Sequence, residues 1–195
     1  MRNVAILVFD DVEVLDFSGP FEVFSVVGRQ KGQSPFDVYT VAEMPGPVFA
    51  RNQFSVNPRY TIADCPAPDI LVVPGGWGTR REMNNARLID WIKTTAPKAE
   101  LVLSVCTGAL LLARAGLLDG LKATTHHGAL DLLREIAPKT TVLDNQRVVD
   151  NGKIIVSAGV SAGIDAAFHV VARLDGLEVA LETARYMEYD WRHEA

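Results

Sequence analysis

The residue most able to do chemistry in this sequence is a cysteine at the junction of two apolar segments. Cys106 follows the apolar segment 101–105 and precedes the apolar segment 109–112, with Gly108 two residues later. A sharp strand-to-helix turn at such a junction exposes a nucleophile, and a glycine lets neighbouring backbone pass close by. Because free N–H groups of the following helix favour a thiolate, we expect a lowered pKa for this thiol. The alternative is a small buried core residue, but the junction favours the nucleophile.

Glycines at positions 75, 76 and 78 follow a second apolar segment, residues 70–73. Their backbone N–H groups carry little steric cover, which is what an oxyanion hole or a phosphate cradle requires. The spacing matches neither a Walker A loop nor the GxGxxG dinucleotide pattern, so nucleotide binding is disfavoured. A plain turn is the alternative, but beside Cys106 we expect Gly75 and Gly76 to contribute to an oxyanion hole.

An acidic residue, Asp16, stands between Leu15 and Phe17 in the loop after the first expected strand. One interpretation is a helix N-cap, a position that aspartate favours. The other is a partly desolvated carboxyl group, whose pKa would be raised so that it donates a proton during catalysis. The residue pattern leaves both roles open.

The adjacent histidines His126 and His127 raise the question of a metal site. No third ligand stands at a recognisable spacing, so we expect neither a metal nor a cofactor. His126 ends an expected strand, where it is the better candidate to lie near the thiol. His169 falls within an expected helix, where we expect it to pack or to face solvent.

The elements that must position these residues alternate between strand and helix along the chain. Strands are expected at residues 4–9, 36–42, 70–73, 100–105, 122–126, 140–144, 148–150 and 154–157, with short paired strands on the sheet edge within 48–56. Helices are expected after a turn with Ser18 as cap and Pro20 in the first helical turn, and at residues 80–95, 107–116, 128–136, 161–174 and 177–188. This α/β order predicts a flavodoxin-like three-layer sandwich, with a mostly parallel sheet covered by helices on both faces. Ligands of such folds bind beyond the carboxyl ends of the strands, so each candidate site should be a strand-to-helix turn.

Composition excludes several classes of protein. The chain has 195 residues, 48% of them hydrophobic, and reads as one domain over residues 1–195 with a sizeable core. Its apolar runs fall short of the ~20 residues of a membrane span, and its start lacks a signal-peptide pattern. The net charge of −5 disfavours nucleic acid as a partner, and two cysteines make no disulfide framework. We therefore expect a cytoplasmic protein that acts on a small molecule.

Five segments together resemble the ThiJ/PfpI superfamily, which is related to class I glutamine amidotransferase domains. They are residues 15–20, 73–76, 104–109, 115–120 and 123–126, and they occur in the superfamily's order. The resemblance extends from about residue 4 to residue 188. Within the superfamily it is strongest to the isonitrile hydratase branch and to the domains fused to AraC-type DNA-binding regions, because both carry a Cys-Thr-Gly elbow and an Ala-Thr-Thr-His segment.

This resemblance implies roles for individual residues. Cys106 becomes the nucleophile, Asp16 the carboxyl that faces its sulfur, and the reacting atom is surrounded by backbone of Gly75, Gly76 and Thr107. It also implies a homodimer, for which apolar surface near the first strands and residues 48–56 is the expected interface.

Three departures from the superfamily's patterns narrow the expected function. Thr107 stands where the protease branch has a histidine, so peptidase activity is doubtful. His127 replaces the usual tryptophan of the hydratase branch, which alters the expected pocket lining. No AraC-type extension or basic patch follows the last expected helix, so direct DNA binding is disfavoured.

The resemblance favours a lyase that hydrates an isonitrile covalently to an N-substituted formamide. Cys106 would attack the terminal carbon, Asp16 would protonate it, and water would release the product. Expected apolar lining by Phe17, Trp77 and Leu110 supports this substrate. The alternatives are a glyoxalase- or deglycase-like enzyme for α-oxoaldehydes, with Asp16 or His126 moving the proton, and a non-enzymatic redox sensor in which Cys106 forms a sulfinate.

Overall fold

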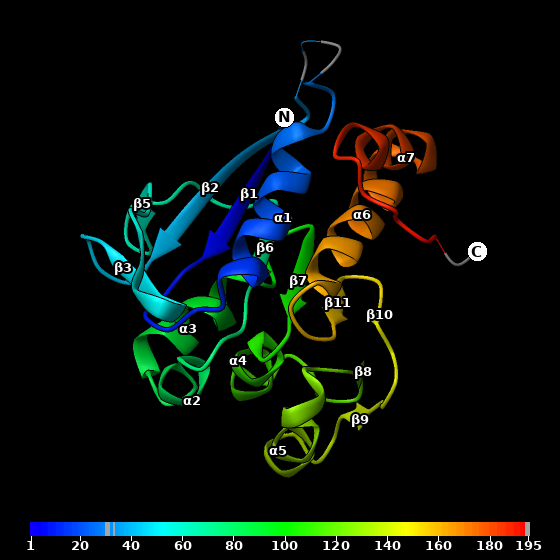
Figure 1. The fold of residues 1–195 in the computed structure, drawn as a ribbon. Helices are drawn as coiled ribbons and strands as arrows, with labels where there is room; N and C mark the ends of the chain where they lie inside the picture. Colours follow the sequence, from blue (N-terminus) through cyan, green and yellow to red (C-terminus); the bar gives the residue numbers. More distant parts are fainter. Residues whose placement is uncertain (30–31, 33, 194–195) are drawn as a thin grey trace.

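A seven-stranded sheet forms the centre of the molecule (Figure 1). The computed structural model describes residues 1–29, 32 and 34–193. The strand order is β10-β11-β7-β6-β1-β2-β5, and only β10 runs antiparallel to its neighbour. The strands are β1 (Arg2–Leu7), β2 (Phe36–Ala42), β5 (Tyr60–Thr61), β6 (Ile70–Val73), β7 (Leu101–Val105), β10 (Val148–Asp150) and β11 (Ile154–Ser157). The predicted mostly parallel sheet is confirmed.

Helices cover both faces of this sheet, which is why its central strands are apolar throughout. On one face lie α1 (Val14–Val26), α6 (Ala162–Asp175) and α7 (Leu177–Tyr186). On the other lie α2 (Thr79–Glu82), α3 (Ala86–Thr95), α4 (Gly108–Arg114) and α5 (Leu130–Ile136). Every residue of β6 and β7 is buried between the two layers. Within the described residues, no helix has the length and apolar character that a bilayer span needs.

Helix α1 begins earlier than the sequence predicts. Ser18 and Pro20 lie inside it rather than at its start, and the Ser18 hydroxyl donates to the Val14 carbonyl at 2.7 Å. Packing explains the difference, because α1 lies so close to α6 that a Cβ on Gly19 would meet Ile164 Cγ1 at 2.8 Å. Burial of this face overrides the local turn signals of glycine and proline.

The predicted helix 80–95 is two helices, α2 and α3. Asn85 interrupts it, adopts an extended backbone and accepts the Leu88 N–H at 3.3 Å, so it caps α3. Asparagine favours this position because its side chain replaces a missing helical acceptor.

Three other expected elements are shorter or placed differently. Strands β8 (Lys122–Ala123) and β9 (Thr141–Val142) pair only with each other, as a separate two-stranded sheet. A 3₁₀ turn (His127–Ala129) precedes α5. Strands β3 (Val48–Ala50) and β4 (Phe54–Val56) pair as predicted, but they form their own small sheet rather than the edge of the large one.

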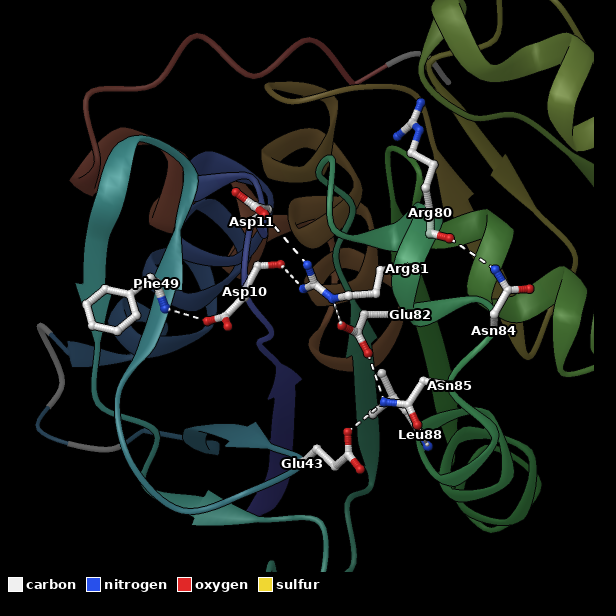
Figure 2. Close-up of polar contacts among 10 residues, drawn as sticks. All are labelled: Asp10, Asp11, Glu43, Phe49, Arg80, Arg81, Glu82, Asn84, Asn85 and Leu88. Atoms are coloured by element: carbon white, nitrogen blue, oxygen red, sulfur yellow. Dashed lines mark hydrogen bonds and ion pairs between the residues drawn. The ribbon is translucent and has the colours of Figure 1, made fainter.

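The β3–β4 hairpin holds the loop that leads from β1 into α1 (Figure 2). The Phe49 N–H donates to the Asp10 carboxylate at 2.8 Å, and the Asp11 N–H donates to the Phe49 carbonyl at 2.8 Å. From α2, Arg81 donates to the Asp10 carbonyl at 2.8 Å and pairs with Glu82. The hairpin and α2 therefore fix the position of Asp10 and Asp11, in the loop that leads into the helix carrying Asp16.

Candidate active site

Cys106 occupies a strained turn between β7 and α4. Its φ of +57° lies in the left-handed region, which non-glycine residues seldom adopt. The Cys106 N–H donates to the Ser157 and Ala158 carbonyls at 3.2 and 3.1 Å, and its carbonyl accepts the Thr125 hydroxyl at 2.7 Å. The turn after β11 and Thr125 thus hold the sharp turn that the sequence predicts. The predicted exposure of the Cys106 side chain is wrong, because the elbow is packed inside the fold and the side chain is buried.

Asp16 is fully buried beside this cysteine. Its Oδ2 accepts the Gly75 N–H at 3.0 Å, while Oδ1 has no partner at ordinary hydrogen-bond distance among the described residues. Burial raises the pKa of Asp16 to about 7 and the nearby charge of Glu13 adds to this, although the Gly75 hydrogen bond and the nearby Cys106 thiol and Val160 N–H oppose the rise. The predicted desolvation of the carboxyl and the rise of its pKa are confirmed, while its part in catalysis stays a prediction. The capping interpretation is wrong, because Glu13 occupies the N-cap of α1.

The expected low pKa of the Cys106 thiol is not found. The side chain is 5% exposed, and burial together with the charge of Asp16 raises the thiol pKa to about 12. Backbone N–H groups of Thr107 and Val160 favour the thiolate but only partly offset these effects. Two desolvated acids therefore face each other, and above about pH 7 they hold one proton between them.

Alkylation of Cys106 by iodoacetamide is expected to accelerate as the pH rises through about 7, where Asp16 loses its proton. The carboxylate then accepts the thiol proton as the new S–C bond forms. Peptide mass spectrometry measures the rate at each pH, with Cys65 as the internal reference and Asp16→Asn as the control without a titrating acid. The same step near pH 7 in Asp16→Asn would contradict this arrangement.

The predicted oxyanion role of Gly75 and Gly76 changes in the structure, because both N–H groups already have acceptors. Gly75 donates to Asp16, and Gly76 donates to the Thr107 hydroxyl at 2.9 Å. The N–H groups that act on the sulfur belong instead to Thr107, as expected, and to Val160. Gly75 therefore holds the Asp16 carboxyl, and Gly76 holds the Thr107 side chain.

Gly75→Ala is expected to destabilise the fold and to reduce activity. The added Cβ would lie 2.4 Å from the Thr107 nitrogen and 2.9 Å from Asp16 Oδ2, so backbone must shift. Such overpacking costs about 1–3 kcal/mol. Thermal unfolding measures the loss, with Gly128→Ala as the control, since its Cβ would meet no described atom nearer than 3.4 Å. Equal stability of the two variants would contradict the tight fit at Gly75.

Val160 is the site residue that the sequence interpretation misses. It lies in the turn after β11 with a φ of +52°, unusual for a β-branched residue, and its N–H acts on both Cys106 and Asp16. The available signal was its place at the carboxyl end of a parallel strand, the rule that identified the other turns.

His126 lies beside this turn but does not hydrogen-bond to the thiol in the described chain. Its Nδ1 accepts the Gly128 N–H at 3.1 Å, and its ring contacts the His127 ring in a tilted arrangement and packs against Gly159. Burial, His127 and Arg80 lower the pKa of His126. Neutral His126 therefore keeps its proton on Nε2, because Nδ1 is an acceptor.

Of the three residues expected to give the site an apolar lining, two are buried and one is exposed, so their contact with a substrate stays a prediction. Phe17 and Leu110 pack in the hydrophobic core, whereas Trp77 is 65% exposed.

A cavity of about 510 Å³ lies away from Cys106, between β10, α6 and residues 189–193, and Cys106 does not line it. His169 pairs with Asp150 there at 2.7 Å, as a partly exposed helical residue. In the parts of the chain that the structure describes, no group of three potential ligands could hold a metal ion.

Comparison with known proteins assigns the chain to a family. The profile of the DJ-1/PfpI family matches residues 2–173. The chain belongs to the DJ-1/PfpI family. Among its relatives, isonitrile hydratase of Pseudomonas putida is 34% identical over 187 residues, which are 96% of this chain and 78% of the relative.

Two further proteins are similar to this chain. A crystal structure of a ThiJ/PfpI family protein from Pseudomonas syringae has a TM-score of 0.88 and 30% identity, and the match covers 100% of this chain and 77% of that one. The HTH-type transcriptional regulator GbdR of Pseudomonas aeruginosa is 23% identical over 97% of this chain, which spans about half (51%) of the regulator. That this DJ-1/PfpI chain binds no nucleic acid stays a prediction.

Proposed function

We propose that the protein is a cysteine-dependent hydratase that converts an isonitrile to an N-substituted formamide. The observation that carries the proposal is the buried Asp16 carboxyl, with its pKa of about 7, set against the Cys106 thiol at a strained elbow. Similarity to isonitrile hydratase of Pseudomonas putida supports the choice of substrate.

The first chemical step adds the S–H bond across the isonitrile carbon. The Asp16 carboxylate accepts the thiol proton while sulfur bonds to the terminal carbon, and the resulting acid delivers that proton to the same carbon. The product is a thioimidate, R–N=CH–S–Cys106, and Asp16 is again a carboxylate. A group with a pKa near 7 suits both halves of this transfer.

The second step hydrolyses the thioimidate. Asp16 accepts a proton from water as the water oxygen bonds to the carbon, and Asp16 then passes this proton to the imine nitrogen. The tetrahedral adduct R–NH–CH(OH)–S–Cys106 collapses with cleavage of the C–S bond, its hydroxyl proton goes to the Cys106 sulfur, and R–NH–CHO is released with Asp16 again a carboxylate. Backbone N–H groups of Thr107 and Val160 stabilise the departing thiolate.

The alternatives draw less support from the site. An enzyme for α-oxoaldehydes would use the same thiol, but His126 offers only Nε2, since Nδ1 is bound to Gly128. A redox sensor needs an accessible thiolate, whereas Cys106 is 5% exposed with a raised pKa. A peptidase needs a base such as histidine beside the thiol, and in the described residues only Asp16 fills that place.

Two substrates distinguish these activities. The purified protein is incubated with cyclohexyl isocyanide and, separately, with methylglyoxal, and the products are measured by NMR. Formation of N-cyclohexylformamide supports the hydratase. Lactate formation that depends on Cys106, without any formamide, would favour the α-oxoaldehyde enzyme over the hydratase. If neither substrate gives a product, the redox sensor is favoured.

The proposal includes a homodimer that acts in the cytoplasm. Phe49 and Phe54 on the β3–β4 hairpin are 44% and 56% exposed, and this hairpin is part of the surface expected to be the interface. Sedimentation of the wild-type protein at micromolar concentration tests the association.

A further inference from the structure

Arg80 carries a charge that no carboxylate neutralises among the described residues. Its Nη1 reaches only the Gly76 carbonyl and the Thr79 hydroxyl, at 3.4 and 3.5 Å, and its guanidinium lies 4.5 Å from the centre of the Trp77 ring. Figure 2 shows how it differs from its neighbour, because Arg81 points into a network with Asp11 and Glu82 while Arg80 points away from it. Arg80 as a residue is partly buried, and its guanidinium has only these weak contacts, so it keeps the capacity to bind an anion through further N–H groups.

This guanidinium lies at the edge of the Cys106 site. The Gly76 carbonyl that it contacts also accepts the Thr107 hydroxyl at 3.1 Å, and Thr107 directly follows the nucleophile. The charge of Arg80 also lowers the pKa of His126, in the loop after β8. Arg80 therefore lies between two loops of the site.

We propose that Arg80 binds a carboxylate on the substituent of the substrate, so that the preferred isonitriles are anionic. The proposal rests on the hydratase function proposed above. His126 adds a second donor from the opposite loop, because its proton is on Nε2. Glu13 is also near, since its charge acts on both Asp16 and His126. Without Arg80, Glu13 and Asp16 would repel an anionic substrate, so the guanidinium decides the preference.

A pair of substrates that differ in one charge tests the preference. Isocyanoacetate and methyl isocyanoacetate carry the same reacting group, and their products are N-formylglycine and its methyl ester. The ratio of kcat/KM for the acid to that for the ester is expected to fall about tenfold in Arg80→Gln, the size of one charge-assisted hydrogen bond. Arg59→Gln removes the same charge from the far β2–β5 edge, where Arg59 pairs with Asp37, and should keep the ratio.

Alkylation gives a readout that does not depend on turnover. Iodoacetate is anionic and iodoacetamide is neutral, so the ratio of their rates reports the local preference for anions. This ratio is expected to be higher at Cys106 than at Cys65, and to fall about tenfold at Cys106 in Arg80→Gln. High salt should lower it in the wild type.

The two measurements separate the two proposals. If both isonitriles are hydrated and Arg80→Gln changes neither ratio, the role of Arg80 is overturned and the hydratase stands. If neither isonitrile reacts, the hydratase fails, and the alkylation ratio alone decides whether Arg80 selects anions. Equal iodoacetate preference at the two cysteines, unchanged by Arg80→Gln, overturns the inference in either case.

Discussion

Cys106→Ala is expected to abolish formamide production, with a loss of roughly 10⁵-fold or more, as removal of a covalent nucleophile commonly produces. Alanine keeps the small side chain that the elbow holds at its φ of +57°, but it removes the sulfur that forms the thioimidate. Product formation from cyclohexyl isocyanide, followed by NMR over hours, measures a loss of this size.

Two further variants make this result specific. Cys106→Ser keeps a donor of similar size at the elbow, but an alcohol with its ordinary high pKa should restore little activity. Cys65→Ala removes the other free thiol, which is partly buried and belongs to a different loop, and should retain full activity. If formamide production survives in Cys106→Ala but is lost in Cys65→Ala, the nucleophile is Cys65 and the role proposed for Cys106 is wrong.

Asp16→Asn is expected to reduce hydration by about 10²–10⁴-fold, the usual contribution of a positioned acid–base group. The amide can still accept the Gly75 N–H, so the loop keeps its contact, but it cannot carry the thiol proton to carbon. At the same time the pKa of Cys106 should fall, because the charge of Asp16 is one cause of its rise. The variant is therefore expected to alkylate faster at alkaline pH while turning over more slowly. Near pH 7 the variant also lacks the carboxylate that accepts the thiol proton, so the comparison is made at alkaline pH, where a loss of the alkylation rate together with turnover would indicate damage to the elbow instead.

The same substitution has an expected effect on stability that depends on pH. Because the folded-state pKa of Asp16 lies above its usual value of 3.8, stability is full below about pH 4 and is lost as the pH rises toward 7. The rise to about 7 corresponds to about 4 kcal/mol in total. Asp16→Asn lacks this titration, so its free energy of unfolding should gain on that of the wild type between pH 4 and 8. Denaturant unfolding at several pH values measures it, and parallel curves would contradict a buried titrating acid.

Periodicity and apolar runs in the sequence were enough to predict the sheet. Strands buried on both faces, such as Ile70–Val73, read as short apolar runs because nothing polar fits between two helical layers. Helix starts were predicted less well. The segment around Ser18 and Pro20 carries strong turn signals, and only the packing of Gly19 against Ile164 of α6 makes it helical. That contact is far apart in sequence, so no local pattern reports it.

For the candidate site too, the sequence predicts the residues but not the properties that depend on tertiary contacts. Residue type and a place in a strand-to-helix turn predicted Cys106 and Asp16 as site residues, and the structure brings these two side chains together. The direction of the thiol pKa shift was predicted wrongly, because it depends on burial and on the charge of Asp16, which outweigh the N–H groups at the start of α4. The roles of Gly75 and Gly76 likewise depend on which acceptors their N–H groups find, and that is a property of the assembled turns.

The assembly of this site from distant turns has a consequence for the kinetics of folding. Asp16 meets Gly75 across 59 positions of sequence, and Gly76 meets Thr107 across 31. Parallel strands pair only after such long loops close, which makes this class of sheet slow to form. Every species on the folding pathway that lacks docked α1 therefore leaves Cys106 without its acid and open to solvent. A newly made chain is most vulnerable to oxidation at this thiol during that interval, and the arrival of the N-terminal helix, rather than the formation of the elbow, ends it.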